Sequence, residues 1–254
     1  MAGQDRHIHG VVVRLQPYGD ADLIVAFVGA EVGRVDAFAR SARSSLKRFG
    51  GRLELFVEGD ATLRIGTGRL PTLASFERTR THVDVALDYA RLALASLIAE
   101  LACQAAQPDH ADARLYAWLV DALPWVIAMD SGHLAEGRLA VELSWLNALG
   151  ALPVVARCGA CGGTLKGGAS WPEADDGLRC RDCSPHGAVA LDAGDMAAFT
   201  ALQRGELDAA APRLSGAGAQ LLRRRSAGLL ADHLPRAPRS ADALDRILAG
   251  NPRG

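Results

Sequence analysis

The sequence predicts an α+β protein in which a small β-barrel is followed by an α-helical domain that carries a four-cysteine metal-binding segment. Three features of the chain support this fold class. Residues 8–76 hold about six short β-rich runs at roughly ten-residue spacing, and residues 81–249 hold longer helical patterns. Two Cys-x2-Cys pairs interrupt the helical half. With 254 residues, of which 49% are hydrophobic, the chain has enough apolar side chains for one large core or a few small ones.

The first predicted strand begins with the apolar residues Ile8, Val11 and Val13. Two hairpins and a last strand follow, at residues 23–28 with 32–38, at 53–57 with 61–65, and at 70–76. Strands so close in sequence favour a closed or partly closed barrel, because a parallel sheet needs crossover helices between its strands. The polar and basic residues 41–50 are expected to form a loop or short helix between two strands.

Thr81 is expected to cap a first helix that runs to about residue 106, and Asp109 is expected to cap a second. A third helix is predicted at about 134–149. All three are apolar on more than one side, so they are expected to pack on each other as a bundle. Later helical patterns cover residues 190–203, 216–233 and 240–249. The predicted domains are a barrel at 1–80, a helical domain at 81–156 and 188–254, and an inserted metal-binding segment at 157–187.

Four of the five cysteines form two Cys-x2-Cys pairs separated by 18 residues: Cys158, Cys161, Cys180 and Cys183. This spacing is typical of a zinc ribbon, and four thiolates match the tetrahedral coordination of Zn²⁺. Four protein ligands leave no position for water, so the ion is expected to be structural rather than catalytic. The alternatives are two disulfides, which the cytoplasm disfavours, free buried thiols, or His186 as a substitute ligand. Cys103 is expected to be a small buried hydrophobe.

The formal net charge of −1 conceals a polarised chain. Residues 1–80 carry 12 basic and 9 acidic side chains, residues 81–150 carry 3 and 9, and residues 151–254 carry 13 and 11. From Arg34 to Arg52, six basic residues accompany a single acidic one, Asp36. Such a cluster is either solvated surface or a region that contacts nucleic-acid phosphates. The predicted DNA-binding residues are Arg34, Arg40, Arg43, Lys47, Arg48 and Arg52.

Other functional classes are disfavoured by what the sequence lacks. Its apolar content excludes a disordered chain, and its longest apolar run of helical character, residues 92–99, is far shorter than the ~20 residues of a membrane span. No secretory signal precedes the first strand, so a cytoplasmic protein is expected. The sequence holds no phosphate-binding loop, dinucleotide fingerprint or nucleophile elbow, and no catalytic residue is predicted.

Several stretches of the sequence, spread over nearly the whole chain, carry a resemblance to a known family. The most specific piece is Gly150 and Pro153 followed by the Cys158-Gly-Ala-Cys161 turn. The other pieces lie in the opening strands, the basic stretch, the helix before the first cysteine pair and the C-terminal part. They are Val12-Val13-Arg14, Tyr18-Gly19-Asp20, Asp22, Leu23-Ile24-Val25, Gly33-Arg34, Ala39-Arg40-Ser41-Ala42-Arg43, Ser45, Gly51, Leu53, Phe56, Ala140-Val-Glu-Leu143, Leu146, Arg239-Ser240 and Leu244. Together these stretches resemble the RecO family of bacterial recombinational repair proteins.

The resemblance implies an oligonucleotide-binding (OB) barrel followed by a helical domain with a zinc-binding segment. It implies binding of single- and double-stranded DNA, annealing of complementary strands, and help in loading RecA onto DNA coated by single-strand-binding protein (SSB). RecR is the implied partner, the C-terminal tail of SSB is expected to dock on the helical domain, and the protein is expected to be nucleoid-associated. The alternative is a zinc-ribbon protein-interaction module or a transcription-associated scaffold.

Aromatic residues make up only 5% of the chain, and the basic stretch contains only Phe38 and Phe49. OB barrels that hold single strands tightly stack bases on aromatic rings. The scarcity of rings here predicts that binding runs mainly through phosphates. A strand held by its backbone keeps its base edges free to pair, as annealing requires.

Overall fold

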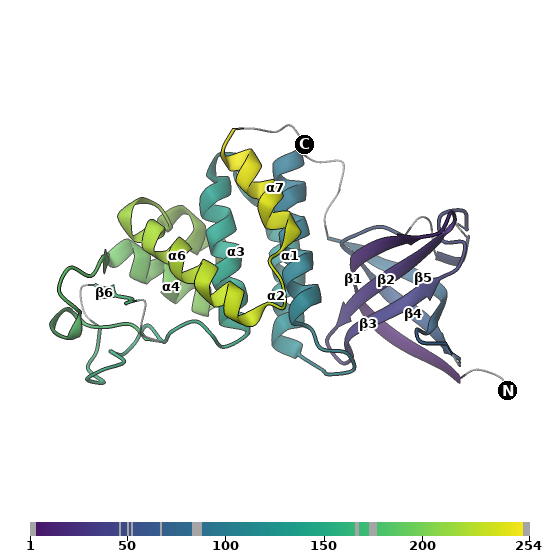
Figure 1. The fold of residues 1–254 in the computed structure, drawn as a ribbon, viewed down its shortest axis with the longest axis horizontal. Coiled ribbons are helices and arrows are strands. Elements are labelled where there is room, and N and C mark those ends of the chain that lie inside the picture. Colours follow the sequence, from purple (N-terminus) through teal and green to yellow (C-terminus); the bar gives the residue numbers. More distant parts are fainter. Residues whose placement is uncertain are drawn as a thin grey trace. The chain divides into compact units, whose positions relative to one another are not determined.

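The computed structural model describes residues 4–45, 47–49, 51, 53–66, 68–82, 88–165, 168–172 and 177–250 (Figure 1). The strand-rich N-terminal part is a closed barrel in the order β1-β2-β3-β5-β4. All neighbouring strands are antiparallel except β3 and β5, which pair in parallel at Phe38 and Thr72. This is the five-stranded architecture of an OB barrel, and the predicted fold class is confirmed. The strands are β1 (Gln4–Tyr18), β2 (Asp22–Gly29), β3 (Gly33–Ala39), β4 (Val57–Ile65) and β5 (Thr72–Thr81).

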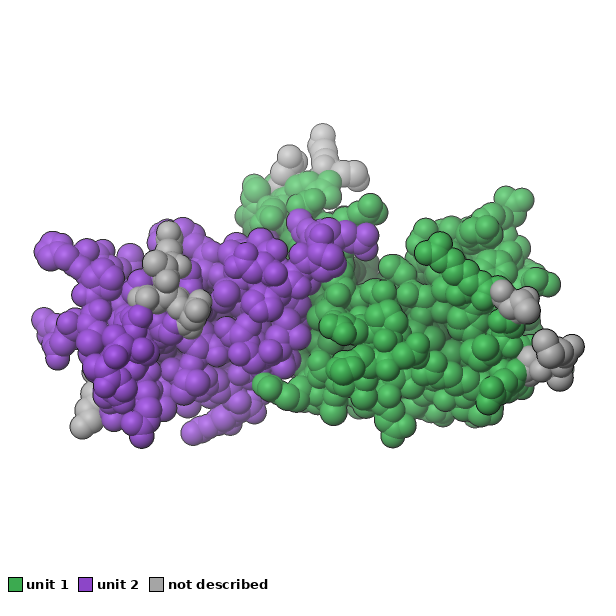
Figure 2. Space-filling model, turned by 60° about the horizontal axis from the view of Figure 1, so that its bottom comes forward, with its two compact units in different colours: residues 1–127, 238–254 green, residues 128–237 purple. Residues whose placement is uncertain are grey.

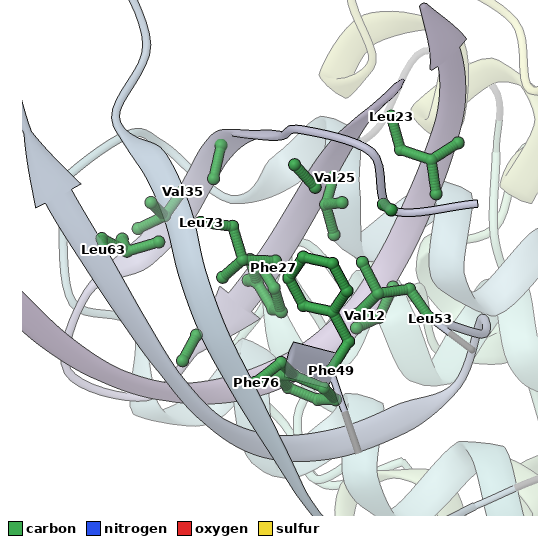
Figure 3. Close-up of a cluster of buried hydrophobic side chains, with 14 of the residues drawn as sticks. Val12, Leu23, Val25, Phe27, Val35, Phe49, Leu53, Leu63, Leu73 and Phe76 are labelled. Carbon is green, nitrogen blue, oxygen red and sulfur yellow. The ribbon is translucent and has the colours of Figure 1, made fainter. Parts of the chain in front are cut away.

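Strand β3 illustrates why these residues form a barrel. Its side chains alternate, with Val35, Ala37 and Ala39 buried and Arg34 and Phe38 partly exposed. Such a period of two directs one set of side chains to the interior of a sheet that closes on itself. The interior is filled by apolar side chains from all five strands (Figure 3).

The predicted hairpin at residues 53–57 and 61–65 is wrong. Residues Glu58-Gly59-Asp60 continue a single strand, β4, instead of turning. Gly59 lies opposite Gly10 of β1, and a Cβ atom there would come within 2.2 Å of the Glu77 carbonyl oxygen on β5. This glycine permits a close approach of backbones, which is the other common reason for glycine inside a strand.

Two helix starts also differ from the prediction. Thr81 ends β5, and α1 (Tyr89–Ala105) is capped by Asp88, whose Oδ1 accepts the Arg91 N–H at 2.9 Å. Helix α2 (Ala113–Ala128) is capped by Asp112, which accepts the Leu115 N–H at 2.9 Å. In both cases the cap lies nearer to the helix than the residue that the sequence favoured, because an N-cap oxygen reaches only the N–H groups two or three positions ahead.

The later helical predictions are confirmed within a few residues. They correspond to α3 (Leu134–Ala148), α4 (Ala193–Gln203), α6 (Gly216–His233) and α7 (Arg239–Leu248). No described helix combines the length and the apolar content needed to cross a membrane. The short elements are η1 (Lys47–Phe49), η2 (Ser131–His133), β6 (Ala169–Ser170), η3 (Arg181–Cys183), β7 (Ala190–Leu191), α5 (Leu207–Ala210) and η4 (Ala211–Arg213).

The chain forms two compact units (Figure 2). Unit 1 comprises residues 1–127 and 238–254 and holds the barrel, α1, α7 and all of α2 except its last residue. Within it, the Ser240 N–H and hydroxyl groups donate to Glu100 at 3.0 and 2.8 Å, which fixes α7 on α1. Unit 2 comprises residues 128–237, and there the buried Ser226 hydroxyl donates to Glu142 at 2.9 Å and joins α6 to α3.

Candidate metal centre and candidate nucleic-acid interface

The four cysteines of the two Cys-x2-Cys pairs meet in unit 2. Their Sγ atoms all lie within 4.8 Å of one another, and none of them is in a disulfide. The Sγ atoms of Cys161 and Cys180 are 3.9 Å apart. Zn–S bonds of about 2.3 Å in a tetrahedron place sulfur atoms about 3.8 Å apart. The cluster of Cys158, Cys161, Cys180 and Cys183 therefore fits a tetrahedral metal ion, and its convergence was predicted.

Tight backbone turns hold the two cysteine pairs. The Cys158 N–H donates to the Gly163 carbonyl at 2.8 Å, and Gly162, at a φ of 69°, donates to the Cys158 carbonyl at 2.9 Å. The second pair closes a 3₁₀ turn in which the Cys183 N–H donates to the Cys180 carbonyl at 3.1 Å. These short turns direct both thiols of each pair to one point, and glycine adopts the left-handed φ at the least cost.

The electrostatics of the cluster favour a bound cation. Backbone N–H groups of Cys161 and Cys180 hydrogen-bond the Cys158 sulfur and lower the pKa of that thiol to about 6. The pKa of Cys183 is raised, mainly by its hydrogen bonds with the Cys180 and Cys161 sulfurs. Four neighbouring thiols cannot all lose their protons unless a positive ion compensates the charge. The donor set is thus suited to a soft divalent cation.

A buried tryptophan joins this segment to the helices of unit 2. Trp171 makes an edge-on contact with Phe199 of α4, with ring centroids 5.7 Å apart. The Arg225 guanidinium of α6 lies 4.8 Å from the centre of the Trp171 ring. Arg225 belongs to a run of three arginines, of which Arg223 and Arg224 are exposed. One of these three arginines therefore packs on the cysteine segment.

We use "basic insert" for residues 40–56, which connect β3 to β4. Its apolar side chains enter the barrel: Ala42, Phe49 and Leu53 belong to the buried core. Figure 3 shows Phe49 pointing inward toward Phe27 and Phe76. The basic residues described between these buried side chains, Arg43, Lys47 and Arg48, are exposed, so the insert is anchored in the core on one side and carries cations on the other.

Arg34 is set apart from the other predicted DNA-binding residues. Its guanidinium forms an ion pair with Asp36 at 3.2 Å and donates to the Cys103 carbonyl at 3.2 Å, at the end of α1. The preceding residue, Gly33, packs so closely on the α1–α2 connection that a Cβ atom would come within 2.3 Å of the Gln107 carbonyl oxygen. Arg34 therefore joins the barrel to α1 within unit 1. Cys103 itself is buried, as expected for a lone cysteine.

Four other predicted residues are exposed on the basic insert: Arg40, Arg43, Lys47 and Arg48. Arg43 donates to the Asp20 carbonyl at 3.2 Å, and Arg48 donates to Ser45 at 2.9 Å and covers the Phe49 ring. Within the described residues, the charged groups of Arg40 and Lys47 have no ion-pair or hydrogen-bond partner. Among the described residues, the insert thus has two cations that make hydrogen bonds within the chain and two that make none. Arg52, the sixth predicted residue, lies outside the described residues.

Sequence reasoning missed an aromatic pair beside the insert. Tyr18, at the end of β1, is 56% exposed, and its ring meets the Phe38 ring edge-on, with centroids 5.5 Å apart. Twenty residues separate the two in sequence, and only the β1–β2–β3 register brings them together. The alternation of β3 could have shown that Phe38 faces outward, because it follows the outward-facing Asp36 by two positions.

A second feature not predicted is a hydrogen-bonded cluster around Glu58 of β4. The Glu58 carboxylate accepts from the Tyr116 hydroxyl on α2 at 2.5 Å and contacts ring nitrogens of His82 and His9 at 2.8 and 3.1 Å. Burial alone would raise the pKa of Glu58, but these hydrogen bonds outweigh burial and lower it. Burial lowers the pKa of His82, whose side chain is fully enclosed. The cluster links the barrel to α2 within unit 1.

Comparisons with known proteins match nearly the whole chain. The family model described as "Recombination protein O N terminal" matches residues 1–82, and "Recombination protein O C terminal" matches residues 86–242. A protein named "DNA repair protein RecO" from Anaeromyxobacter sp. (strain K) is 36% identical over 245 residues, which cover 94% of this chain and 95% of the relative. Another of that name, from Frankia casuarinae, is 32% identical over 249 residues, which cover 93% and 97%.

Proposed function

The chain belongs to the RecO family of DNA repair proteins, and on this premise we propose that it is a mediator of homologous recombination. It binds single- and double-stranded DNA and anneals complementary strands. With RecR as its partner, it helps to load RecA onto single-stranded DNA coated by SSB, whose C-terminal tail docks on the helical domain. It acts by binding and not as an enzyme, in the bacterial cytoplasm and in association with the nucleoid.

The DNA-binding part of this proposal rests on one observation: the basic insert buries its apolar side chains and exposes its cations. Its apolar residues are fixed in the barrel core, so its exposed cations stand on a rigid support. Arg40 and Lys47 have no partner among the described residues, so they need not break an ion pair to bind phosphate. Contacts of this kind give affinity for any sequence and release counterions, which makes binding sensitive to salt.

Annealing follows from binding by the backbone. Of the two rings between Arg34 and Arg52, Phe49 is fully buried and is not available to stack on a base, and only Phe38 is partly exposed. A strand held chiefly by its phosphates presents its base edges to a second strand. Neutralising phosphates also reduces the repulsion between two strands, which accelerates their encounter.

The metal held by Cys158, Cys161, Cys180 and Cys183 is Zn²⁺ in this proposal. Four thiolates complete its coordination, so it supplies order and no chemistry. The domain division at residues 80, 157 and 187 is part of the same proposal, with the zinc-binding segment inserted in the helical domain.

The test is annealing of complementary oligonucleotides coated with SSB, together with a salt titration of binding to single-stranded DNA. Replacing Arg40 and Lys47 together by Ala should weaken binding about tenfold at low salt and slow annealing. The slope of log affinity against log salt should become shallower by about 1.4, since each contact with a single strand contributes about 0.7.

The matched control replaces two exposed arginines of unit 2, Arg204 and Arg236, by Ala. This double variant loses the same charge and should leave affinity and slope close to those of the wild type. If both double variants behave alike, the basic insert is not the DNA contact. If the wild-type protein anneals no strands, a protein-interaction module becomes the better description.

A further inference from the structure

We propose that Tyr18 and Phe38 form a stacking site for one unpaired nucleobase of single-stranded DNA, beside the phosphate contacts of the basic insert. This inference rests on the proposed function and names the part of the DNA that the site recognises. The two rings meet at an interplanar angle of 89° with centroids 5.5 Å apart. Such an edge-to-face contact fixes the orientation of a ring and leaves ring surface open, and Tyr18 is 56% exposed.

The two rings stand on the outer face of the three-stranded β1–β2–β3 sheet. Phe38 pairs with Ile24 of β2, and Ile24 pairs with Gln16 of β1, two residues before Tyr18. Ile24 is partly exposed, so it extends the apolar surface of the rings across the middle strand. The inner side of the same strands is occupied by the barrel core, and a ligand therefore reaches the rings only from this outer face.

Hydrogen bonds tie this aromatic pair to the cations. Tyr18 directly precedes the β1–β2 turn, and Arg43 donates to the carbonyl of Asp20 in that turn at 3.2 Å. The N–H groups of Ser41 and Arg43 donate to the Asp22 carboxylate at 2.7 Å and to the Ala21 carbonyl at 3.0 Å. The turn after Tyr18 and the start of the basic insert thus form one hydrogen-bonded unit, which holds Arg43 beside the strand end that carries Tyr18.

The neighbouring charge selects the occupant. Arg40 follows Phe38 by two residues, at the first position after β3; it is exposed, and its guanidinium has no partner among the described residues. A flat aromatic group that is attached to an anion satisfies both features, and a nucleobase with its phosphate is such a group. In duplex DNA the bases are stacked on each other, so the site favours single strands.

The experiment measures binding of the full-length protein to three oligomers by fluorescence anisotropy. These are a single strand, the duplex of the same sequence, and a single strand of abasic sugar-phosphate units with the same charge. Tyr18→Ala should bind the normal single strand about tenfold more weakly, in the range that removal of one stacked base produces. Its salt slope should not change, and its affinity for the abasic strand and for the duplex should equal that of the wild type.

Tyr18→Phe should restore the affinity for the normal strand, because the ring and not the hydroxyl group stacks. Phe38→Ala should reproduce part of the loss, since it removes the support of the Tyr18 ring. Equal weakening of the normal and abasic strands by Tyr18→Ala would overturn the stacking site, and so would an unchanged affinity for all three oligomers. Failure of the wild type to bind any of them would instead overturn the proposed function.

Discussion

The barrel and the cysteine segment reach an ordered structure by different means. The barrel interior holds a cluster of sixteen buried apolar side chains, contributed by five strands and by the basic insert. In the described part of residues 157–187, the buried apolar side chains besides Cys158 are Ala169, Trp171 and Leu178. Burial of apolar surface is thus sufficient for the barrel, whereas the segment needs another source of free energy. In the proposed function, Zn²⁺ bound by the four thiols is that source.

Removal of the proposed Zn²⁺ should produce the largest difference between the two regions. Zinc binding to sites of this kind contributes about 10 kcal/mol to the folded state. Treatment with a strong chelator, or Cys161→Ser together with Cys180→Ser, should abolish the protection of backbone amides such as those of Gly159 and Cys183. Hydrogen exchange followed by mass spectrometry measures this protection peptide by peptide.

The barrel supplies the internal reference for that experiment. Amides of β2 should exchange at the same rate with and without metal, because their hydrogen bonds depend on apolar packing in unit 1. Unchanged protection of the cysteine segment after chelation would mean that Trp171 and Leu178 suffice to order it. That result would remove the physical distinction between the two regions.

Phe49→Ala tests the barrel side of the comparison. Phe49 is fully buried among the core side chains, and truncation of such a ring costs about 3–5 kcal/mol. Denaturant unfolding should show this loss. DNA affinity should also fall, because the basic insert loses its anchor. The control is Ile65→Ala at an exposed position of β4, which should change stability by less than about 0.5 kcal/mol. Full stability of Phe49→Ala would show that the insert is not part of the barrel core.

Glu58→Gln addresses the polar link between the barrel and α2. The variant weakens the hydrogen bonds to Tyr116, His82 and His9, and a loss of about 2 kcal/mol at pH 7 is expected for a charged acceptor. Because the folded pKa of Glu58 lies below its ordinary 4.5, its stabilisation is complete above that pH and is lost as pH falls through the lowered value. The effect of His82 on stability has the same direction. Its folded pKa lies below the ordinary 6.5, so the unfolded chain binds the proton first and stability is lost as pH falls below 6.5.

Unfolding free energies measured from pH 4 to pH 8 check this expectation. His9 has a raised pKa, so its contribution is present at low pH and is lost as pH rises through the folded value. Wild-type stability should still fall toward pH 4, and the fall below about pH 4.5 should be smaller in Glu58→Gln. Equal pH dependence of the two proteins would show that the Glu58 carboxylate does not differ between the folded and unfolded states.

The same contrast explains which features could be predicted from the sequence. The cysteine cluster could be, because the spacing of each pair is a local property that forces two thiols to one point. The long alternation of β3 and the full length of α6 are also local and were predicted. The Glu58-Gly59-Asp60 stretch was misread as a turn, because the need for glycine at position 59 comes from β5. Tyr18 was overlooked because its relation to Phe38 depends on strand register.

Gly162→Ala is expected to have the smallest effect. Its φ of 69° is unfavourable for alanine, and a Cβ atom there meets nothing within 4 Å, so the cost is that of the backbone alone, about 1 kcal/mol. Because Gly162 closes the turn around Cys158, that cost should appear as weaker zinc binding, by about fivefold to tenfold. Competition with a chromogenic chelator measures it.

Gly205→Ala is the matched control for this substitution. Gly205 also lies in unit 2, has a φ of 78°, and leaves open space for a Cβ atom, but it follows α4 and not a cysteine pair. The two variants should lose similar amounts of unfolding free energy in the zinc-bound protein. Only Gly162→Ala should weaken zinc binding. If Gly205→Ala weakened zinc binding equally, zinc affinity would depend on the stability of all of unit 2. The order of the cysteine segment would then depend on the packing of the helices around it.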